Sequence, residues 1–313
     1  MPSRAIVQLA NTQQLREGGG FLVRRPVGNR GVSNVDPFIM LDHLGPVDYK
    51  PGEAIGAPDH PHRGFETVTY VIDGGIEHKD SAGNTGILKP GWVQWMTAGR
   101  GVVHSEMPPA DLLKRGGRME GFQLWVNLPK SHKFIAPRYQ DTPAANVPEV
   151  TSADGKTFIR VLAGSALGQT SPIETHIKIL LLDIRISAGG CYDHPLPNSY
   201  QGFVYCWRGK GKVGSADAAI TMGQVAVLSE SAHGDSFTMK ASPTEECRLL
   251  FACGEPIGEP VVQHGPFVMN TEEEIQEAIN DYRSGKLGEI PGAEKRYQET
   301  EAARNKQKAS GTW

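Results

Sequence analysis

The sequence lacks a hydrophobic segment long enough to span a lipid bilayer. No run of 18 or more apolar residues occurs in it, and a transmembrane helix needs about 20. The opening residues Met1 to Val7 also lack the apolar core of a secretory signal peptide. These absences favour a cytoplasmic protein without a membrane partner, with a nuclear location open to a eukaryotic protein.

Cysteine is scarce, and basic residues are not in excess. The cysteines show no C-x-x-C spacing, so we expect reduced, mostly buried thiols and neither a disulfide framework nor a zinc site; they are Cys191, Cys206, Cys247 and Cys253. The formal net charge of -3 provides no electrostatic footprint for direct binding of nucleic acid. At 313 residues the chain fits two domains of ordinary size.

Glycine and proline, in contrast, are plentiful, with 37 and 22 residues spread along the chain. Between Phe65 and Leu128 they separate short segments rich in β-branched and aromatic residues. One such segment, Phe65 to Ile72, is followed by the turn sequence Asp73-Gly74-Gly75. Short strands at this regular spacing, without helical periodicity, predict an antiparallel sandwich or barrel.

The second half of the sequence resembles the first. Asp193-His194-Pro195-Leu196 corresponds to Asp59-His60-Pro61-His62, with leucine in place of the second histidine. His233-Gly234-Asp235 is similar to His104-Ser105-Glu106. We therefore predict an internal duplication that gives two barrels, the second without a full set of metal ligands. A chain that already contains two barrels is expected to be a monomer.

One helix is expected near the C-terminus. Thr271 and Glu274 form a capping-box signature, and the apolar residues that follow recur with helical spacing as far as Gly285. From about Gly292 the chain is polar and is expected to form a frayed tail. The predicted domains are residues 1–145, residues 146–290 with the helix at 271–284, and a polar tail at 291–313.

Two histidine triplets in the first half point to a metal site. His60-Pro61-His62 and His104-Ser105-Glu106 each place two ligand-type side chains at i and i+2, so that both point to one face of a strand. Two such strands side by side would present three imidazoles and a carboxylate. This set suits iron, manganese, nickel or copper, with coordination positions left open for a further ligand. Glu66 is an alternative carboxylate, because by parity it shares a face with His62.

The other histidines of the first half are expected to be structural. His43 follows an apolar run and is interpreted as a buried, hydrogen-bonded histidine. His78 is interpreted, with Lys79 and Asp80, as part of a solvated hairpin edge.

Longer motifs in the sequence resemble the pirin family, whose members are bicupins. These motifs are Asp36 to His43, His60 to Val68, Gln94 to Pro108 and Pro266 to Glu273. The resemblance implies an all-β fold of two cupin (jelly-roll) β-barrels in tandem with a short C-terminal helix. It also implies that Fe²⁺ is bound by His60, His62, His104 and Glu106, whereas Glu66 is not a ligand. Manganese, nickel, cobalt, copper and zinc are compatible with the same ligands.

The same resemblance implies two kinds of function. One is quercetin 2,3-dioxygenase-type activity, in which O₂ opens the ring of a flavonol or of another small, planar, metal-chelating phenol. In that reaction Glu106 would be catalytic and would accept the proton of the substrate hydroxyl. The alternative is an iron-dependent, redox-sensing regulatory protein, similar to transcriptional coregulators, that binds partners without turnover. We favour the enzyme, because no basic cluster resembles a nuclear import signal.

Overall fold

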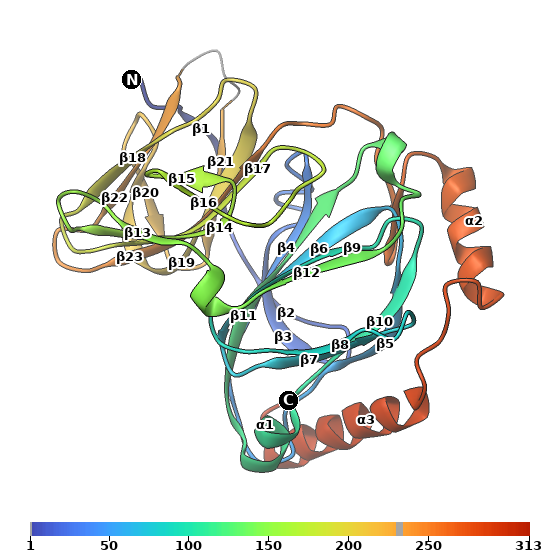
Figure 1. Cartoon of the computed structure of the whole chain (residues 1–313). Coiled ribbons are helices and arrows are strands. Elements are labelled where there is room, and N and C mark those ends of the chain that lie inside the picture. The colour runs from blue at the N-terminus through green and yellow to red at the C-terminus, as the bar shows by residue number, and fades with distance from the viewer. Residues whose placement is uncertain (1, 230–233) are drawn as a thin grey trace. The chain divides into compact units, whose positions relative to one another are not determined.

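The computed structural model describes residues 2–229 and 234–313 (Figure 1). It divides into two compact units, in which strands predominate and helices are few. The unit that contains the histidine triplets, called the histidine unit below, comprises residues 14–24, 42–144 and 259–313. The second unit comprises residues 1–13, 25–41 and 145–258. The units therefore differ from the linear division at residues 145 and 290. The N-terminal segment 1–13 belongs to the second unit, and the C-terminal segment 259–313 belongs to the histidine unit.

Two antiparallel sheets make up most of the histidine unit. The larger has the order β12-β9-β6-β11-β4-β3-β2, and the smaller has the order β5-β10-β7-β8. The strands are β2 (Gln14–Glu17), β3 (Phe21–Val27), β4 (Phe38–Tyr49), β5 (Ala57–His62), β6 (Phe65–Asp73), β7 (Ile76–Asp80), β8 (Thr85–Leu88), β9 (Val93–Thr97), β10 (Val102–Met107), β11 (Gly117–Asn127) and β12 (Arg138–Thr142). The strand expected after His62 is β6, and Gly74 in the turn after it has a φ of 78°, which a glycine adopts without steric cost.

Short helices and one further hairpin also belong to the histidine unit. They are α1 (Ala110–Arg115), the 3₁₀ turns Lys130–His132 and Ala144–Asn146 near its boundary, and the hairpin of β24 (Val262–His264) and β25 (Phe267–Met269). None of the helices among the described residues is long and apolar enough to cross a membrane.

The second unit is built on a ten-stranded antiparallel arrangement. Its main path runs β1-β21-β19-β23-β17-β14-β13, and β18, β20 and β22 pair beside it. The strands are β1 (Ile6–Asn11), β13 (Glu149–Thr151), β14 (Thr157–Ala163), β17 (Ile179–Ile186), β18 (Cys191–Pro195), β19 (Gln201–Val213), β20 (Ala218–Thr221), β21 (Gln224–Leu228), β22 (Ser236–Ala241) and β23 (Cys247–Gly254), with a small hairpin of β15 (Ser165–Ala166) and β16 (Gln169–Thr170). Its core contains a large apolar cluster that includes Leu182, Val204 and Phe251. The four cysteines are free thiols, and only Cys191 is exposed.

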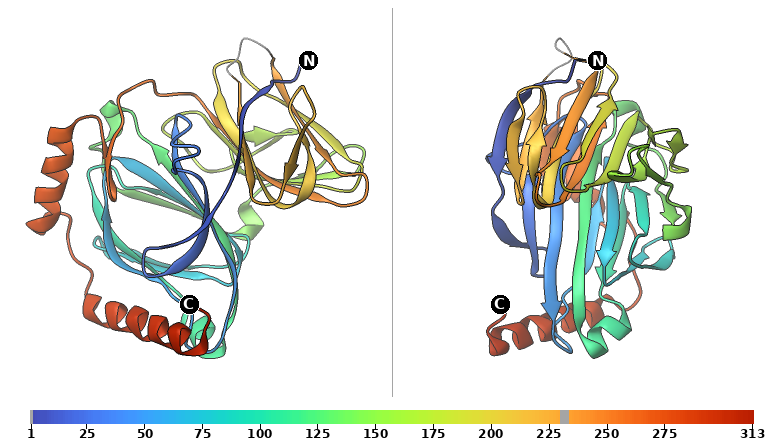
Figure 2. Two further views of the ribbon diagram at one scale, coloured as in Figure 1. Left: turned by 180° about the vertical axis from the view of Figure 1, so that it is seen from behind. Right: turned by 90° about the vertical axis from the view of Figure 1, so that its left-hand side faces the viewer.

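The predicted C-terminal helix is confirmed as α2, Glu272–Arg283. The Thr271 hydroxyl accepts a hydrogen bond from the backbone N–H of Glu274, and the Glu274 carboxylate accepts one from the backbone N–H of Asn270. The first contact satisfies a backbone donor that the first turn of a helix leaves free, and the second joins the residue before the N-cap to that turn. Ile275 and Ala278 then pack in a cluster with Val103 of β10, so the helix covers the histidine unit (Figure 2).

A second C-terminal helix, α3 (Ala293–Ser310), occupies most of the segment expected to be a frayed tail. Its buried residues recur with helical spacing, but most of them are polar; they are Arg296, Thr300, Ala303 and Gln307. Each polar member has a hydrogen-bond partner, which makes its burial tolerable. The expectation failed because helical patterns are recognised by an apolar stripe, and this helix has a polar one.

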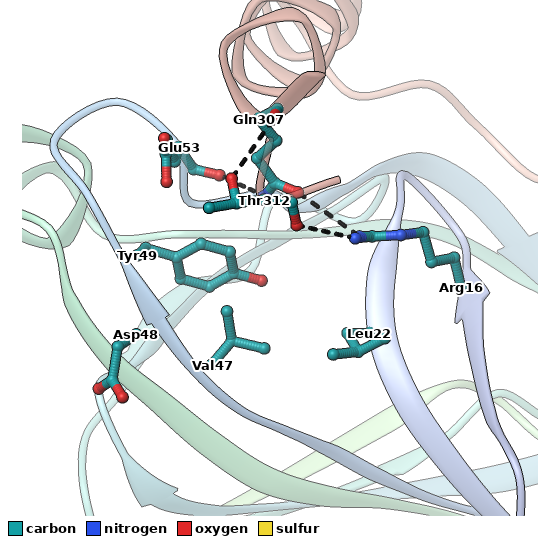
Figure 3. A pocket seen from close by; sticks show the side chains of 8 residues that line it. All are labelled: Arg16, Leu22, Val47, Asp48, Tyr49, Glu53, Gln307 and Thr312. Carbon is teal, nitrogen blue, oxygen red and sulfur yellow. Dashed lines mark hydrogen bonds between the residues drawn. The ribbon is translucent and has the colours of Figure 1, made fainter. Parts of the chain in front are cut away.

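The end of α3 lies beside β2 and β4 (Figure 3). Arg16 donates to the Gln307 side chain and to the backbone oxygen of Thr312. The guanidinium also lies 4.3 Å from the ring centroid of Trp313, a cation–π contact. These contacts fasten the helix at its C-terminal end.

Lys133 is fully buried in the histidine unit and joins three segments of it. Its ammonium group donates to the backbone oxygens of Gly64 and Val268 and to the side-chain oxygen of Asn127, at 2.8 to 3.0 Å. Burial lowers the pKa of Lys133 to about 8. The lysine thus fixes the turn between β5 and β6, next to the histidines of β5.

Lys133→Met is expected to lower the free energy of unfolding by about 2 kcal/mol, because three buried oxygens lose their donor. Urea unfolding monitored by circular dichroism measures this change. The exposed Lys130→Met in the same turn is the matched control and should leave the stability almost unchanged. Equal stability of the two variants would contradict the joining role of Lys133.

Candidate metal centre

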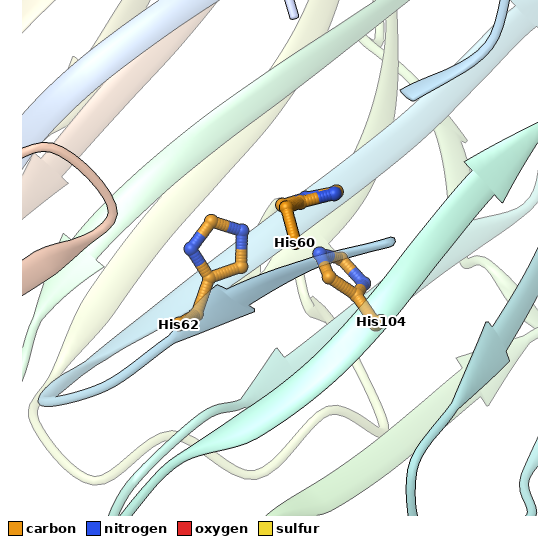
Figure 4. A group of neighbouring side chains, drawn as sticks. All are labelled: His60, His62 and His104. Atoms are coloured by element: carbon orange, nitrogen blue, oxygen red, sulfur yellow. The ribbon is translucent and has the colours of Figure 1, made fainter. Parts of the chain in front are cut away.

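Strands β5 and β10 bring the three histidines to one face of the smaller sheet. His60 and His104 are direct partners across the antiparallel pair, and His62 follows His60 by two positions, so all three rings share that face. Ring centroids are 4.3 Å apart for His60 and His104, and 4.9 Å for His62 and either of the others. Each ring offers a nitrogen, and the three nitrogens lie within 4.8 Å of one another (Figure 4).

Hydrogen bonds to carbonyl groups orient two of the three rings. The Nδ1–H of His60 donates to the backbone oxygen of Pro58 at 2.8 Å, and the Nδ1–H of His62 faces the backbone oxygen of Pro266 at 3.4 Å. A carbonyl oxygen only accepts, so Nδ1 carries a proton, and in the neutral ring Nε2 then keeps its lone pair. This is the tautomer that metal-binding histidines have when an outer hydrogen bond orients them.

His104 provides the observation that tests whether a metal fits here. The side chain is buried, and neither of its nitrogens has a hydrogen-bond partner among the described residues. A buried polar group without a partner costs free energy, and coordination would give one of the two nitrogens a partner. The three imidazoles therefore fit a divalent transition metal.

Burial also affects the protonation of His62 and His104. It lowers the pKa of His62 and of His104 well below the usual range, and the neighbouring histidines lower both further. The neutral form, which is the form that binds metals, is therefore favoured at neutral pH.

Glu106 lies on the same strand and face as His104, but apart from the three-histidine group. Between these two residues the pairing of β10 with β5 shifts, so that Glu106 is opposite Ala57. Its buried carboxylate accepts hydrogen bonds from the Gln123 amide at 2.8 and 3.0 Å and from the Thr69 hydroxyl at 3.3 Å. Glu106 stays a predicted ligand and base, now with known hydrogen-bond partners.

Glu66, the alternative carboxylate, lies on the other face of β6. Thr69, which contacts Glu106, is an odd number of positions from Glu66 along β6. The side chains of Glu66 and Thr69 therefore point to opposite faces of the strand. Glu66 accepts a hydrogen bond from Thr97 at 2.6 Å, and burial raises its pKa to about 7. Parity from His62 misleads because Gly64, with a φ of 89°, turns the chain between β5 and β6.

The interpretation of His78 and Asp80 as a solvated edge is wrong, because both side chains are buried. On β7 they lie opposite Glu106 and His104, respectively. His78 stacks on Tyr139, with ring centroids 5.2 Å apart, and its Nε2 lies 3.5 Å from the carboxylate of Asp141. The buried polar side chains of β7 therefore form a second polar row beside the three histidines. The feature that indicates this row is the alternation along β7, in which every second residue is buried.

His43 matches its predicted role, and two aromatic side chains lie beside the three histidines. His43 is buried, with its Nε2 3.2 Å from the Glu120 carboxylate, as expected of a structural histidine. Phe65 and Trp125 lie beside His62, with ring centroids 5.1 and 5.2 Å from its ring. They form an apolar wall next to the histidine group.

The second unit has no comparable group among its described residues. His194 lies opposite Phe237 on β22, and Leu196 belongs to the apolar core. The His194 Nδ1 is 2.8 Å from the Tyr192 hydroxyl, and burial lowers the pKa of the histidine to about 4. His233, the other histidine considered in this half, lies outside the described residues.

Comparison with known proteins gives the family. The family model for pirin matches residues 20–126, and the model for the pirin C-terminal cupin domain matches residues 181–288. Human pirin is 40% identical over 289 residues, which cover 91% of this chain and 94% of human pirin. The chain belongs to the pirin family. A pirin-like protein from Solanum lycopersicum is also 40% identical, over 91% of this chain and 93% of its own length.

A solved structure agrees with this assignment. The crystal structure of a quercetin 2,3-dioxygenase from Acinetobacter baumannii superimposes with a TM-score of 0.86 at 34% identity, covering 93% of this chain and 100% of that one. The predicted fold class, two cupin barrels in tandem, is confirmed for this member of the pirin family.

Proposed function

We propose that the protein is a metal-dependent dioxygenase that uses O₂ to open the ring of a flavonol or a similar metal-chelating phenol. The observation that carries this proposal is the group of three inward-facing histidines inside a cupin barrel, one of them without any hydrogen-bond partner among the described residues. The name of the Acinetobacter baumannii relative, a quercetin 2,3-dioxygenase, supports the substrate class.

The metal would be held by His60, His62 and His104, with Glu106 as the proposed fourth ligand. Fe²⁺ is our first choice, and the donor set is also compatible with manganese, nickel, cobalt, copper or zinc. When bound, such an ion supplies Lewis-acid and redox chemistry to a chelating phenol and O₂.

The chain's own residues would bind the phenol and take up its proton. The Glu106 carboxylate would accept the proton of the substrate hydroxyl as a general base. Gln123 and Thr69 hold that carboxylate in place through hydrogen bonds. Phe65 and Trp125, beside His62, would pack against the flat, apolar faces of the substrate rings.

The test is anaerobic purification with metal quantification, followed by O₂ uptake on addition of quercetin. We expect close to one metal ion per chain and quercetin-dependent uptake. His194→Ala is the matched control, because it removes a buried histidine outside the group and should keep both metal and uptake. Bound metal without uptake would favour the redox-sensing regulatory protein, and a native protein without metal would refute the metal centre.

A further inference from the structure

Helix α3 contacts the strand that carries two of the three histidines. The helix follows the last residue matched by the pirin family models, at position 288. It lies against β5 within the histidine unit. Its contacts with β5 centre on Asp59, the residue that directly precedes His60.

An ion pair and a hydroxyl group form this contact. The Arg296 guanidinium donates to both carboxylate oxygens of Asp59, at 2.7 Å for Nη2 and Oδ2, and both side chains are only 9% exposed. Such two-pronged pairs fix geometry as well as charge. The Tyr297 hydroxyl donates to the backbone oxygen of Asp59 at 2.6 Å. The helix therefore holds both the side chain and the backbone of this residue.

Asp59 needs this support because the sheet gives it little. His60 is opposite His104, but Ala57 is opposite Glu106, so β5 has one extra residue between these pairs. Such a bulge interrupts the ladder of hydrogen bonds. Pro58, also within it, has no N–H to donate.

The bulge also determines the orientation of His60. The carbonyl of Pro58 accepts the hydrogen bond that fixes the Nδ1–H of His60. A shift of the Pro58-Asp59 peptide would therefore turn the imidazole and its Nε2. A continuous series of contacts runs from α3 through Asp59 and Pro58 to a ring of the metal centre.

We propose that Arg296 and Tyr297 are positioning residues of the metal centre, which fix the bulge at Pro58-Asp59 and thereby the ring of His60. This inference rests on the proposed binding of a metal by the three histidines. The far end of α3 adds to the same restraint, because Gln307 donates to the backbone oxygen of Glu53, in the segment that leads into β5.

Copper is the probe, because the electron paramagnetic resonance spectrum of Cu²⁺ reports the geometry of its nitrogen ligands. The full chain is loaded with one equivalent of Cu²⁺, and affinity is measured by competition with a chelator. Arg296→Ala is expected to weaken Cu²⁺ binding about tenfold, the lower range for losing an outer partner of a ligand, and to change the copper hyperfine coupling. Asp59→Asn should have the same effect, and the double variant should add nothing to it. Arg296→Lys should recover part of the loss.

Arg304→Ala is the matched control on the same helix. It removes a hydrogen bond from α3 to the backbone oxygen of Gly19, far along the helix from Asp59. An equal change of the copper spectrum in this variant would show that α3 merely stabilises the unit, and would overturn the proposal. A spectrum and affinity of Arg296→Ala equal to those of the wild type would overturn it as well.

Two further results separate the possible failures. If Arg296→Ala does not fold, Tyr297→Phe decides, since it removes a single hydroxyl group; an altered copper spectrum supports the proposal and an unaltered one refutes it. A wild-type protein that binds no copper would refute the metal centre, and with it this inference. A normal copper signal that no α3 variant changes would refute the positioning role alone.

Discussion

Replacing His104 with alanine is expected to abolish metal binding by the three-histidine group. Loss of a partner that only orients a ligand weakens a metal site by about 10- to 100-fold, so loss of a ligand itself should weaken it by more than about 100-fold. Isothermal titration with the metal found in the native protein measures this affinity. His43→Ala, which removes a buried histidine paired with Glu120, is the control in the same unit.

The same variant tests the coupling of metal binding to stability. A metal at about 100 times its dissociation constant should raise the free energy of unfolding of the wild type by about 2.7 kcal/mol. His104→Ala should show no such increase, whereas His43→Ala should keep the increase even if its own stability is lower. A variant without His104 that is still stabilised by metal would place the ion elsewhere.

The three histidines could be predicted as a group because their spacing needs little from the rest of the fold. Histidines at i and i+2 share a face on any strand, and the pairing of β5 with β10 then places His60 opposite His104. The capping box of α2 was equally readable, because its contacts lie within four residues of one another. Features determined by local geometry were therefore predicted correctly.

Two buried polar side chains with distant partners were missed. The burial of His78 depends on Tyr139 and Asp141, more than 60 positions later in the chain. Helix α3 buries Arg296 against Asp59, and these two residues are 237 positions apart in the chain. A polar side chain reads as exposed in a sequence until its partner is known, and here the partners appear only after folding.

The face of Glu66 was missed for a different reason. Side chains alternate between the two faces only along one continuous strand. The turn at Gly64 ends that alternation between His62 and Glu66. Spacing in the sequence alone therefore could not decide between Glu66 and Glu106 as the ligand. In the structure, Thr69 contacts Glu106, and Glu66 lies three positions from Thr69, so Glu66 points to the other face of β6. The two glutamates are both buried and lie on opposite sides of β6, so they form a matched pair for mutagenesis.

Replacing Glu106 with glutamine is expected to reduce quercetin-dependent O₂ uptake by about 100-fold or more, which is the usual contribution of a general base. Glutamine has the shape of glutamate but accepts no proton. The three histidines are expected to retain the metal, since Glu106 lies outside the group that their nitrogens form. The measurements are O₂ uptake and metal content of the same preparation, so that loss of chemistry is distinguished from loss of the ion.

Glu66→Gln is the control for this variant. Burial raises the pKa of Glu66 to about 7, so that a large fraction of this side chain is already uncharged at neutral pH and glutamine resembles that form. We expect the control to keep metal, stability and O₂ uptake. Uptake lost only in Glu106→Gln, with metal retained, would assign the proton transfer to Glu106. Metal lost together with uptake would make Glu106 a ligand that the three histidines cannot replace, and full uptake in Glu106→Gln would contradict both roles.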